Sequence, residues 1–470
     1  MFINQLFRCF IIVATVAPGY LSAQSIHLPV SVEKRGIWQT QGYGYILDVD
    51  ENKVTIFDVT QKHCLLNKEH SGSFSAANLK LINDNRAVFD WRSLHPVTLN
   101  RLSQLPQKCQ KNSLEPNKFD PVQVFDIYWQ TFSEHYAYSE QKNIDWHKQY
   151  AKWRAKVSFT TTEKQLIGVI RQFLKVLDDR HAFLFSADDD VLAYSNAKDS
   201  ILNARVRVGF EQRQGVAHFG RYFDKVVKSW NETVKSYFVD GFEPQYLYNN
   251  FWLGQLPNQL SYLEVEDMSG FATLDGMAAD LVAVDEAFNK ILPSIIGSKG
   301  LVLDLRYNGG GEDLVVERLL SYFIDKPLTI GAKSNKMAEG FSSMRPIVIQ
   351  PVKRLNYTGP IVVLTSVATA SAAELFTLGL SARGNVSFIG ESSNGAYSDM
   401  LFKSLPNGWQ FSLSNEVYVD LKGKSYEVEG FGVSERFEYL NAKDLANATD
   451  SALTRAIEIL SADHTAADTK

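Results

Sequence analysis

Residues 300–311 read GLVLDLRYNGGG, an apolar run followed by charged and polar residues and then three glycines. Because the run lacks polar alternation, it predicts a strand buried on both faces, as in a parallel sheet. Residues 360–365 and 260–265 predict two further strands of this kind, and residues 277–292 predict a helix. This order indicates an α/β core with a mainly parallel sheet and functional residues at the strand ends.

The rest of the chain divides around this core. Short runs rich in β-formers before residue 112 predict a small accessory β domain, and the apolar spacing after it predicts helices. We expect a signal peptide at 1–23, the β domain at 24–112, a helical domain at 113–198, a linking region at 199–258, the α/β core at 259–440, and a C-terminal helix with a polar tail at 441–470.

The N-terminus resembles an export signal. An apolar run at residues 9–17 is followed by Leu21-Ser22-Ala23, a pattern typical of signal-peptidase cleavage, with Gln24 as the mature start. A membrane anchor is the alternative, but spanning a bilayer needs roughly 20 apolar residues. We therefore expect an exported protein, periplasmic or secreted, with no stable membrane span.

The net charge and the cysteine content narrow the possible functions and the cellular compartment of the protein. The net charge of -5 argues against a nucleic-acid binder, which usually carries a basic stripe. After cleavage only Cys64 and Cys109 remain, and an oxidising compartment would allow them to pair; two buried free thiols are the alternative. No metal-ligand spacing such as His-Glu-x-x-His occurs, so we expect no metal and no cofactor.

Two segments at strand ends carry the candidate chemistry. Gly309-Gly310-Gly311 could hold an oxyanion with backbone N–H groups, although a plain glycine turn is the alternative. Ser371 stands among small residues where a helix should begin, so its hydroxyl would be exposed and the Ala372 N–H would point the same way. The alternative is that Ser371 only caps the helix.

Together these segments resemble the tail-specific (C-terminal processing) and tricorn-type serine peptidases. Residues 304–311 resemble the family's Asp-Leu-Arg-x-Asn-x-Gly-Gly element, and residues 369–374 its nucleophile element. Gly390-Glu391 with Gly395 and residues 429–433 match two further ordered motifs. The resemblance implies a crotonase-like (ClpP/crotonase) α/β peptidase fold and a nucleophilic Ser371. Many relatives carry a PDZ domain before the core, but residues 199–258 show no clear PDZ glycine loop.

The identity of the base distinguishes the branches of this family. One bacterial branch uses a lysine in Gly-Lys-Gly, but here the matching residues are Gly395-Ala396-Tyr397, and Lys403 lies too far along the chain to replace it. The tricorn-type branch uses a histidine, and His181, in Asp179-Arg180-His181, resembles its Asp-x-His segment. We therefore expect the histidine-using branch, without the catalytic lysine.

A late glutamate should orient that histidine. Glu429 matches the family's glutamate, and Glu427 is the second choice because alternate residues of a strand share a face. The implied mechanism is a Ser-His-Glu acyl-enzyme pathway on polypeptide substrates, with the oxyanion held by Gly310 and Ala372 N–H groups.

Two other function classes share this fold. One is a non-catalytic ligand-binding protein, as in the retinoid-binding proteins of the photoreceptor matrix, and the other is an acyl-thioester enzyme of the crotonase type. The joint presence of a serine, a histidine and a glutamate argues against the first, and export argues against the second. Neither substrate identity nor oligomeric state follows from the sequence.

Overall fold

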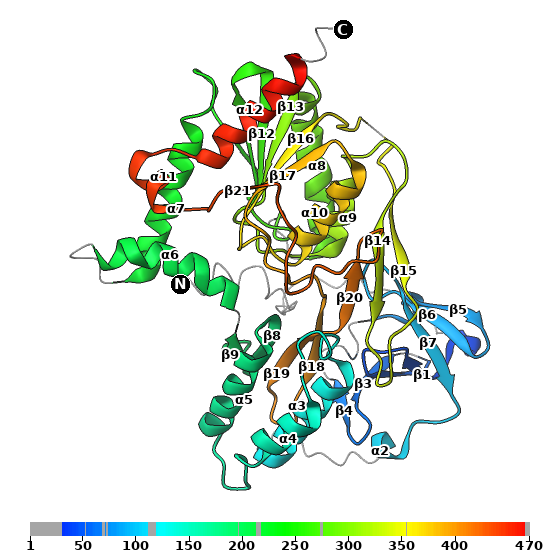
Figure 1. The fold of residues 1–470 in the computed structure, drawn as a ribbon. Helices are drawn as coiled ribbons and strands as arrows, with labels where there is room; N and C mark the ends of the chain where they lie inside the picture. The colour runs from blue at the N-terminus through cyan, green and yellow to red at the C-terminus, as the bar shows by residue number, and fades with distance from the viewer. Residues whose placement is uncertain are drawn as a thin grey trace, which may run out of the picture.

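The computed structural model describes residues 31–465 except 52, 68–70, 72–73, 111–118, 196, 213–217, 273–275 and 354. The predicted signal peptide and the last five residues of the polar tail lie outside this described part. Figure 1 shows the central sheet and its helices at one end of the molecule, and the N-terminal β domain with a group of helices at the other. Within the described residues, no helix is long and apolar enough to cross a membrane.

The central sheet has seven strands in the order β10-β11-β12-β13-β16-β17-β21. From β12 to β21 every neighbouring pair is parallel, which confirms the predicted mainly parallel core. Strands β10 and β11 add antiparallel strands upstream of residue 259, so the sheet begins inside the region expected to be a linker. The strands are β10 (Gln245–Leu247), β11 (Phe251–Leu256), β12 (Leu260–Val265), β13 (Gly300–Asp304), β16 (Ile361–Thr365), β17 (Val386–Gly390) and β21 (Glu435–Arg436).

Helices cover both faces of this sheet. Leu301 and Leu303 of β13 pack with α8 (Met277–Ile296), α9 (Asp313–Ser321) and α10 (Ala372–Arg383). Val302, which points to the opposite face, packs with helices from two separate parts of the sequence. These helices are α6 (Ala197–Glu211), α7 (Phe219–Lys235) and α12 (Ser451–Thr465), with α11 (Ala442–Asn447) preceding the last of them. Burial on both faces explains why the core strands lack polar alternation.

The N-terminal β domain is a seven-stranded antiparallel sheet in the order β4-β3-β2-β1-β7-β6-β5. Cys64 and Cys109 form a disulfide with a Cα–Cα distance of 5.2 Å, as expected for an oxidising compartment. Cys109 belongs to α2 (Gln107–Gln110), so the bond ties this short helix to β4. The strands are β1 (Gly36–Thr40), β2 (Tyr45–Val49), β3 (Val54–Val59), β4 (Cys64–Asn67), β5 (Leu79–Asn83), β6 (Arg86–Phe89) and β7 (Val97–Leu102).

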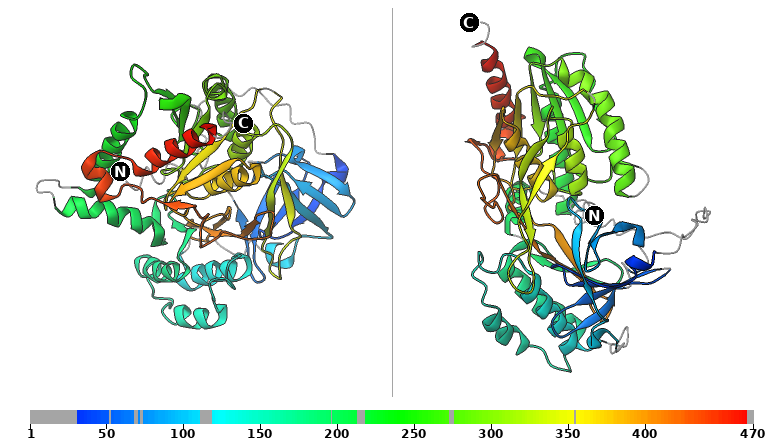
Figure 2. Two further views of the ribbon diagram at one scale, coloured as in Figure 1. Left: turned by 45° about the horizontal axis from the view of Figure 1, so that its top comes forward. Right: turned by 90° about the vertical axis from the view of Figure 1, so that its right-hand side faces the viewer.

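The helical region joins the core through a shared sheet. Its helices α3 (Pro121–His135), α4 (Trp146–Arg154) and α5 (Glu163–Leu177) are followed by β8 (Asp179–Phe185) and β9 (Val191–Ser195). Strand β8 pairs antiparallel with β19 (Gln410–Ser414), which also pairs with β18 (Met400–Ser404). Figure 2 shows these helices beside the β domain, at the end away from the central sheet. The segment that carries His181 is therefore hydrogen-bonded to a strand of the core.

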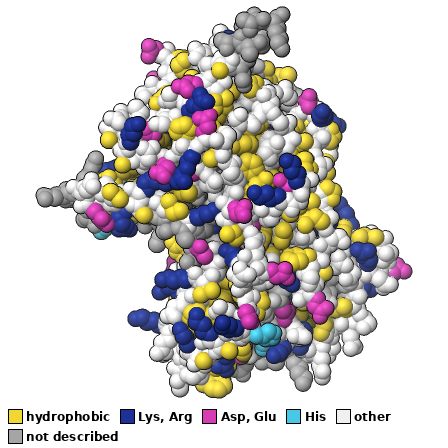
Figure 3. All heavy atoms as spheres, viewed as in Figure 1, with side chains coloured by type: hydrophobic (Ala, Val, Ile, Leu, Met, Phe, Trp, Pro, Cys, Tyr) yellow, Lys and Arg dark blue, Asp and Glu magenta, His cyan; other side chains and the backbone are white. Residues whose placement is uncertain are grey.

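A further small sheet connects the core to the β domain. It contains β14 (Leu328–Asn335), β15 (Arg345–Ile349) and β20 (Glu416–Val419), in the order β15-β14-β20. Because β20 follows β19 directly, the same stretch of chain contributes to both small sheets. Figure 3 shows acidic and basic side chains interspersed over the face of the molecule seen in Figure 1.

Candidate active site

Ser371 lies at a sharp turn between β16 and α10. Its backbone has φ 56° and ψ -128°, a conformation that residues with a Cβ rarely adopt. An ordinary N-cap residue has β-region dihedrals, so the capping role alone does not explain this geometry. Ala370 and Ala372 on either side are buried, whereas Ser371 is partly exposed. The turn therefore presents a serine side chain on a strained backbone, as nucleophile turns do.

Gly310 packs directly against this turn. It has φ +110°, and a Cβ placed on it would lie 2.6 Å from Ser371 Cβ and 3.1 Å from Ala372 N. Only a glycine fits there, because an added Cβ would collide with the serine turn and the backbone region favours glycine. The Asn308 side chain holds the loop, accepting the Gly310 N–H at 2.9 Å and donating to Val265 O at 2.8 Å. The structure thus brings the two predicted oxyanion residues side by side.

The Glu374 side chain accepts hydrogen bonds that stabilise the turn at Ser371. Its fully buried carboxylate accepts the N–H groups of Ser371 at 3.0 Å, Ala396 at 2.8 Å and Gly395 at 2.6 Å. It also accepts the Ser393 hydroxyl at 2.5 Å. Burial raises the pKa of Glu374, and these hydrogen bonds oppose the rise. One side chain therefore joins the start of α10 to the segment that contains Gly395 and Ala396.

Lys403, excluded above as a substitute for the lysine that is absent at residue 396, makes its contacts elsewhere. Lys403 lies in the β-domain interface, where its Nζ donates to Gly44 O and to Asp58 Oδ1, both at 2.9 Å. A lysine distant in sequence lies closer to the site. Lys198 at the start of α6 donates to the carbonyls of Ser393 at 3.3 Å, Val428 at 2.9 Å and Glu429 at 3.1 Å.

Lys198 escaped the sequence reasoning because no motif surrounds it. Burial lowers the pKa of its ammonium, and the negative charges of Glu374, Asp178 and Glu427 oppose that effect. All three carbonyl acceptors belong to the segments that surround the serine turn. Lys198 therefore links α6 to those segments as a charged anchor.

His181 lies on β8 and is fully buried. Its main-chain N–H donates to Asp179 Oδ1 at 2.8 Å, and its carbonyl accepts the Ser412 hydroxyl at 2.7 Å. Burial lowers the pKa of His181 to about 4, and Asp179 opposes this effect. The imidazole is therefore neutral near pH 7 and can accept a proton.

Asp179 is a residue whose role was not recognised from the sequence, although it is the acid of the Asp-x-His segment. Besides the His181 N–H, it accepts the hydroxyls of Tyr136 at 2.7 Å and Ser414 at 2.9 Å. These contacts join α3, β8 and β19. Asp179 therefore fixes the backbone that carries the histidine.

The two candidate glutamates lie in different environments. The Glu429 side chain is 68% exposed and forms an ion pair with Lys424 at 3.5 Å. Glu427 is buried and accepts the N–H groups of Tyr397 at 2.6 Å and Ser398 at 3.1 Å through the same oxygen, Oε2. Burial raises the pKa of Glu427 well above its ordinary value, and the charges of Asp179 and Glu374 raise it further. Glu427 therefore interacts electrostatically with Asp179, which accepts the His181 main-chain N–H, and with Glu374, which accepts the Ser371 N–H.

Comparisons with known proteins agree with these motifs. Residues 259–436 match the family model described as Peptidase family S41, and residues 120–175 match the Tricorn protease C1 domain. The chain is 31% identical over 134 residues to the carboxy-terminal processing protease CtpA of Bacillus subtilis (strain 168). That match covers 28% of this chain and spans 28% of the relative's length.

Solved structures show the same fold. A structure from Parabacteroides merdae ATCC 43184, described as a candidate peptidase, has a TM-score of 0.57 at 21% identity, covering 73% of this chain and 97% of that one. Mature CPAF, solved in complex with lactacystin, has a TM-score of 0.52 at 14% identity, covering 75% of this chain and 99% of that one.

Replacing Glu374 with glutamine should destabilise the protein. Both carboxylate oxygens accept two donors each, so an amide NH₂ would have to face at least one main-chain N–H. We expect Glu374→Gln to lower the free energy of unfolding by about 2–4 kcal/mol, the scale of losing buried hydrogen bonds to a charged group. Urea unfolding followed by circular dichroism measures this, with the exposed Glu339→Gln as the control. Equal unfolding midpoints for the two variants would contradict the role given to Glu374.

Proposed function

Because the chain belongs to peptidase family S41, which includes the tail-specific and tricorn-type serine peptidases, we propose that it is a serine endopeptidase that uses Ser371, His181 and Glu427. The observation that carries this proposal is the strained turn at Ser371, against which Gly310 packs so closely that no other residue fits. A turn of this kind exposes a hydroxyl next to backbone N–H groups, which is the arrangement that acyl transfer needs.

The proposed reaction begins with proton transfer. The His181 imidazole accepts the Ser371 hydroxyl proton as the serine oxygen bonds to the carbonyl carbon of a peptide. The Ala372 N–H, at the positive end of α10, stabilises the oxyanion that forms. The Gly310 N–H is the second donor, and it would share its hydrogen between the oxyanion and Asn308 Oδ1. His181 then protonates the leaving amine, and water attacks the acyl-enzyme with His181 again as the base.

The proposed reaction needs the His181 imidazole within hydrogen-bond reach of the Ser371 hydroxyl in the substrate complex. Catalytic hydrogen bonds in ligand-free structures are often long and tighten only with substrate bound. His181 lies on the sheet shared by the helical region and the core, whereas Ser371 lies at the turn that follows β16 of the central sheet. We propose that bound polypeptide aligns this hydrogen bond for proton transfer. In that state an imidazolium next to Glu427 would lower the pKa of this buried acid and favour its carboxylate form.

We prefer Glu427 to Glu429 as the orienting acid because Glu427 is buried. A fully buried imidazole needs an acceptor that reaches it without water, and the exposed Glu429 instead pairs with Lys424. The Glu427 Oε1 atom has no hydrogen-bond partner among the described residues, whereas Oε2 is held by two main-chain N–H groups. One oxygen thus anchors the side chain and the other is available to accept an imidazole N–H.

Removal of the nucleophile or the base should abolish turnover. We expect Ser371→Ala and His181→Ala each to lower kcat for peptide hydrolysis by about 10⁴-fold or more. The exposed His147→Ala variant, on α4, should keep full activity. Because burial lowers the pKa of His181 to about 4, its base form persists to low pH, and the acidic limb of kcat/KM should lie near pH 4 rather than near 6.5.

Steady-state kinetics on an unstructured protein substrate, with circular dichroism to confirm folding at each pH, provide these measurements. Full hydrolysis by either alanine variant would defeat the assignment. In that case the protein would fit better with a non-catalytic ligand-binding role on the same fold, with Ser371 serving as a helix cap.

The two glutamates can be separated by matched substitutions. Glu427→Gln keeps an oxygen for the two main-chain N–H groups and changes only the free side of the carboxyl. We expect it to lower kcat by about 10²–10⁴-fold with little change in the melting temperature, because the imidazole loses its charged acceptor. Glu429→Gln should stay within about twofold of the parent, since surface ion pairs contribute little. The reverse result would identify Glu429 as the orienting acid.

We also propose that the protein acts outside the cytoplasm on exported proteins or peptides. The Leu21-Ser22-Ala23 pattern and the Cys64–Cys109 disulfide support this location. N-terminal sequencing of native protein should give Gln24 as the first residue. Native cytosolic protein that retains Met1 would contradict the proposal.

A further inference from the structure

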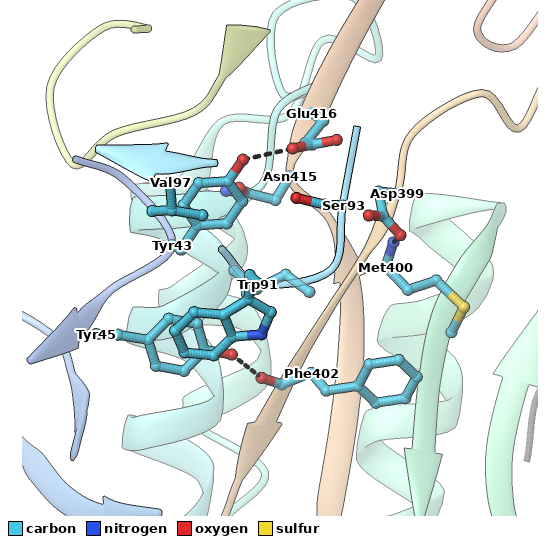
Figure 4. Close-up of a pocket in the computed structure, with 11 residues that line it drawn as sticks. Tyr43, Tyr45, Trp91, Ser93, Val97, Asp399, Met400, Phe402, Asn415 and Glu416 are labelled. Carbon is cyan, nitrogen blue, oxygen red and sulfur yellow. Dashed lines mark hydrogen bonds between the residues drawn. The ribbon is translucent and has the colours of Figure 1, made fainter. Parts of the chain in front are cut away.

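A cavity of about 100 Å³ lies where the β domain meets the strands that follow the candidate active site. The β domain contributes the turn before β2, β2 itself, the loop after β6 and the start of β7. The core contributes the start of β18 and the junction of β19 with β20. Figure 4 shows these side chains around the cavity, which are Tyr43, Tyr45, Trp91, Ser93, Val97, Asp399, Met400, Leu401, Phe402, Asn415 and Glu416.

The β-domain wall is aromatic and held in place. The Tyr45 and Trp91 rings stack with their centroids 5.0 Å apart and their planes 17° from parallel. The Tyr45 hydroxyl donates to Phe402 O at 2.8 Å, and the Tyr43 hydroxyl donates to Glu416 at 2.5 Å. Because these rings already have fixed orientations, a ligand placed against them would have little ordering cost to overcome.

The core side of the cavity carries two acidic side chains, Glu416 and Asp399, which differ in their hydrogen-bond and ion-pair partners. Glu416 is compensated, since it accepts Lys333 Nζ at 2.7 Å and the hydroxyls of Tyr43 and Tyr418. The Asp399 carboxylate accepts only its neighbour's N–H among the described residues, from Met400 at 2.7 Å, and forms no ion pair with any of them. Its side chain has exposed surface, so it is accessible from the cavity. Asp399 is thus the acid that remains available for a ligand.

The charges around Asp399 favour a bound cation. Desolvation within the cavity and the negative charges of Glu416 on β20 and Asp313 on α9 together raise the pKa of Asp399 to about 8. Lys333 on β14 is the cation that opposes this rise. The nearby carboxylates favour the protonated form of Asp399, and Arg345, whose charge acts on Tyr43, is a second cation beside the cavity. A bound cation would replace the proton on Asp399.

We propose that this cavity binds one cationic side chain, lysine or arginine, of a polypeptide that the enzyme recognises. The combination of aromatic rings with an uncompensated carboxylate is suited to such a group, whose methylene stem packs on the rings while its charged end meets Asp399. A volume of about 100 Å³ suits a single side chain, because sites for whole small molecules are typically about 300–1,000 Å³. The inference concerns the substrate class and therefore rests on the proposed peptidase function.

The cavity is joined to the candidate active site by one residue. Ser398 precedes Asp399, donates its main-chain N–H to Glu427 at 3.1 Å, and accepts the Glu416 N–H on its hydroxyl at 3.0 Å. A side chain bound at Asp399 would thus contact the same short segment that positions Glu427. The enzyme would then prefer polypeptides that carry a basic residue at a distance from the cleaved bond.

Binding can be measured without turnover in the Ser371→Ala background. Isothermal titration calorimetry would compare a short alanine- and serine-based peptide that contains one lysine with the same peptide carrying norleucine, which keeps the methylene stem. We expect the lysine peptide to bind about tenfold more tightly, and Asp399→Asn to remove that difference while leaving the norleucine peptide within about twofold. The lysine peptide should also bind more tightly at pH 9 than at pH 6, because Asp399 has then lost its proton.

Controls separate this site from general effects. Asp240→Asn, an exposed acid on a turn outside the cavity lining, should leave both peptides unaffected, and melting temperatures would verify the fold of each variant. Equal binding of the lysine and norleucine peptides by the parent, or an undiminished lysine preference in Asp399→Asn, would overturn the inference. If Asp399→Asn fails to fold, the comparison of the lysine and norleucine peptides in the parent protein decides the inference. Loss of the proposed peptidase role alone would leave these binding results intact.

Discussion

The geometry of the candidate active site depends on one buried carboxylate. Glu374 accepts four hydrogen bonds, and these tie the Ser371 turn to the segment of residues 393–396. A charge buried this deeply is tolerated only when its oxygens are satisfied, so the surrounding main-chain N–H groups have little freedom to move. The strained backbone of Ser371 persists because this contact and the close packing of Gly310 both hold it. The positions of the oxyanion residues follow from the same turn.

The β domain and the helical region differ in how they meet this core. Strand pairing between β8 and β19 connects the helical region to the core, and the Asp179 contacts fix the histidine-bearing strand. The β domain instead packs its aromatic side chains against the strands that lead away from the serine turn, which creates the cavity lined by Asp399. Both attachments converge on residues 397–416, so substrate recognition and catalysis would share one stretch of chain.

Much of the fold could be predicted because local patterns agreed with the tertiary structure. Apolar runs without alternation marked β12, β13 and β16 closely, since both faces of these strands are buried. Strands β10 and β11 were missed because residues 199–258 lack such runs. The Ser371 and Gly310 segments were visible as small residues at strand ends. Lys198 was not, because it reaches Ser393 from a helix 195 residues earlier, and no periodicity encodes that contact. Glu427 and Glu429 differ only in burial, which depends on how the loop around Gly430 folds, so the sequence could not rank them on physical grounds.

The central claim is that Ser371 is an activated nucleophile, and a fluorophosphonate probe tests it most directly because such probes form covalent bonds only with activated serines. The measurement is mass spectrometry of the labelled protein after digestion, with the Ser371→Ala and His181→Ala variants treated in parallel. The account predicts one adduct, on Ser371, that is lost in Ser371→Ala and greatly slowed in His181→Ala. A folded parent protein that takes up no label, or that is labelled on a different serine, would contradict it.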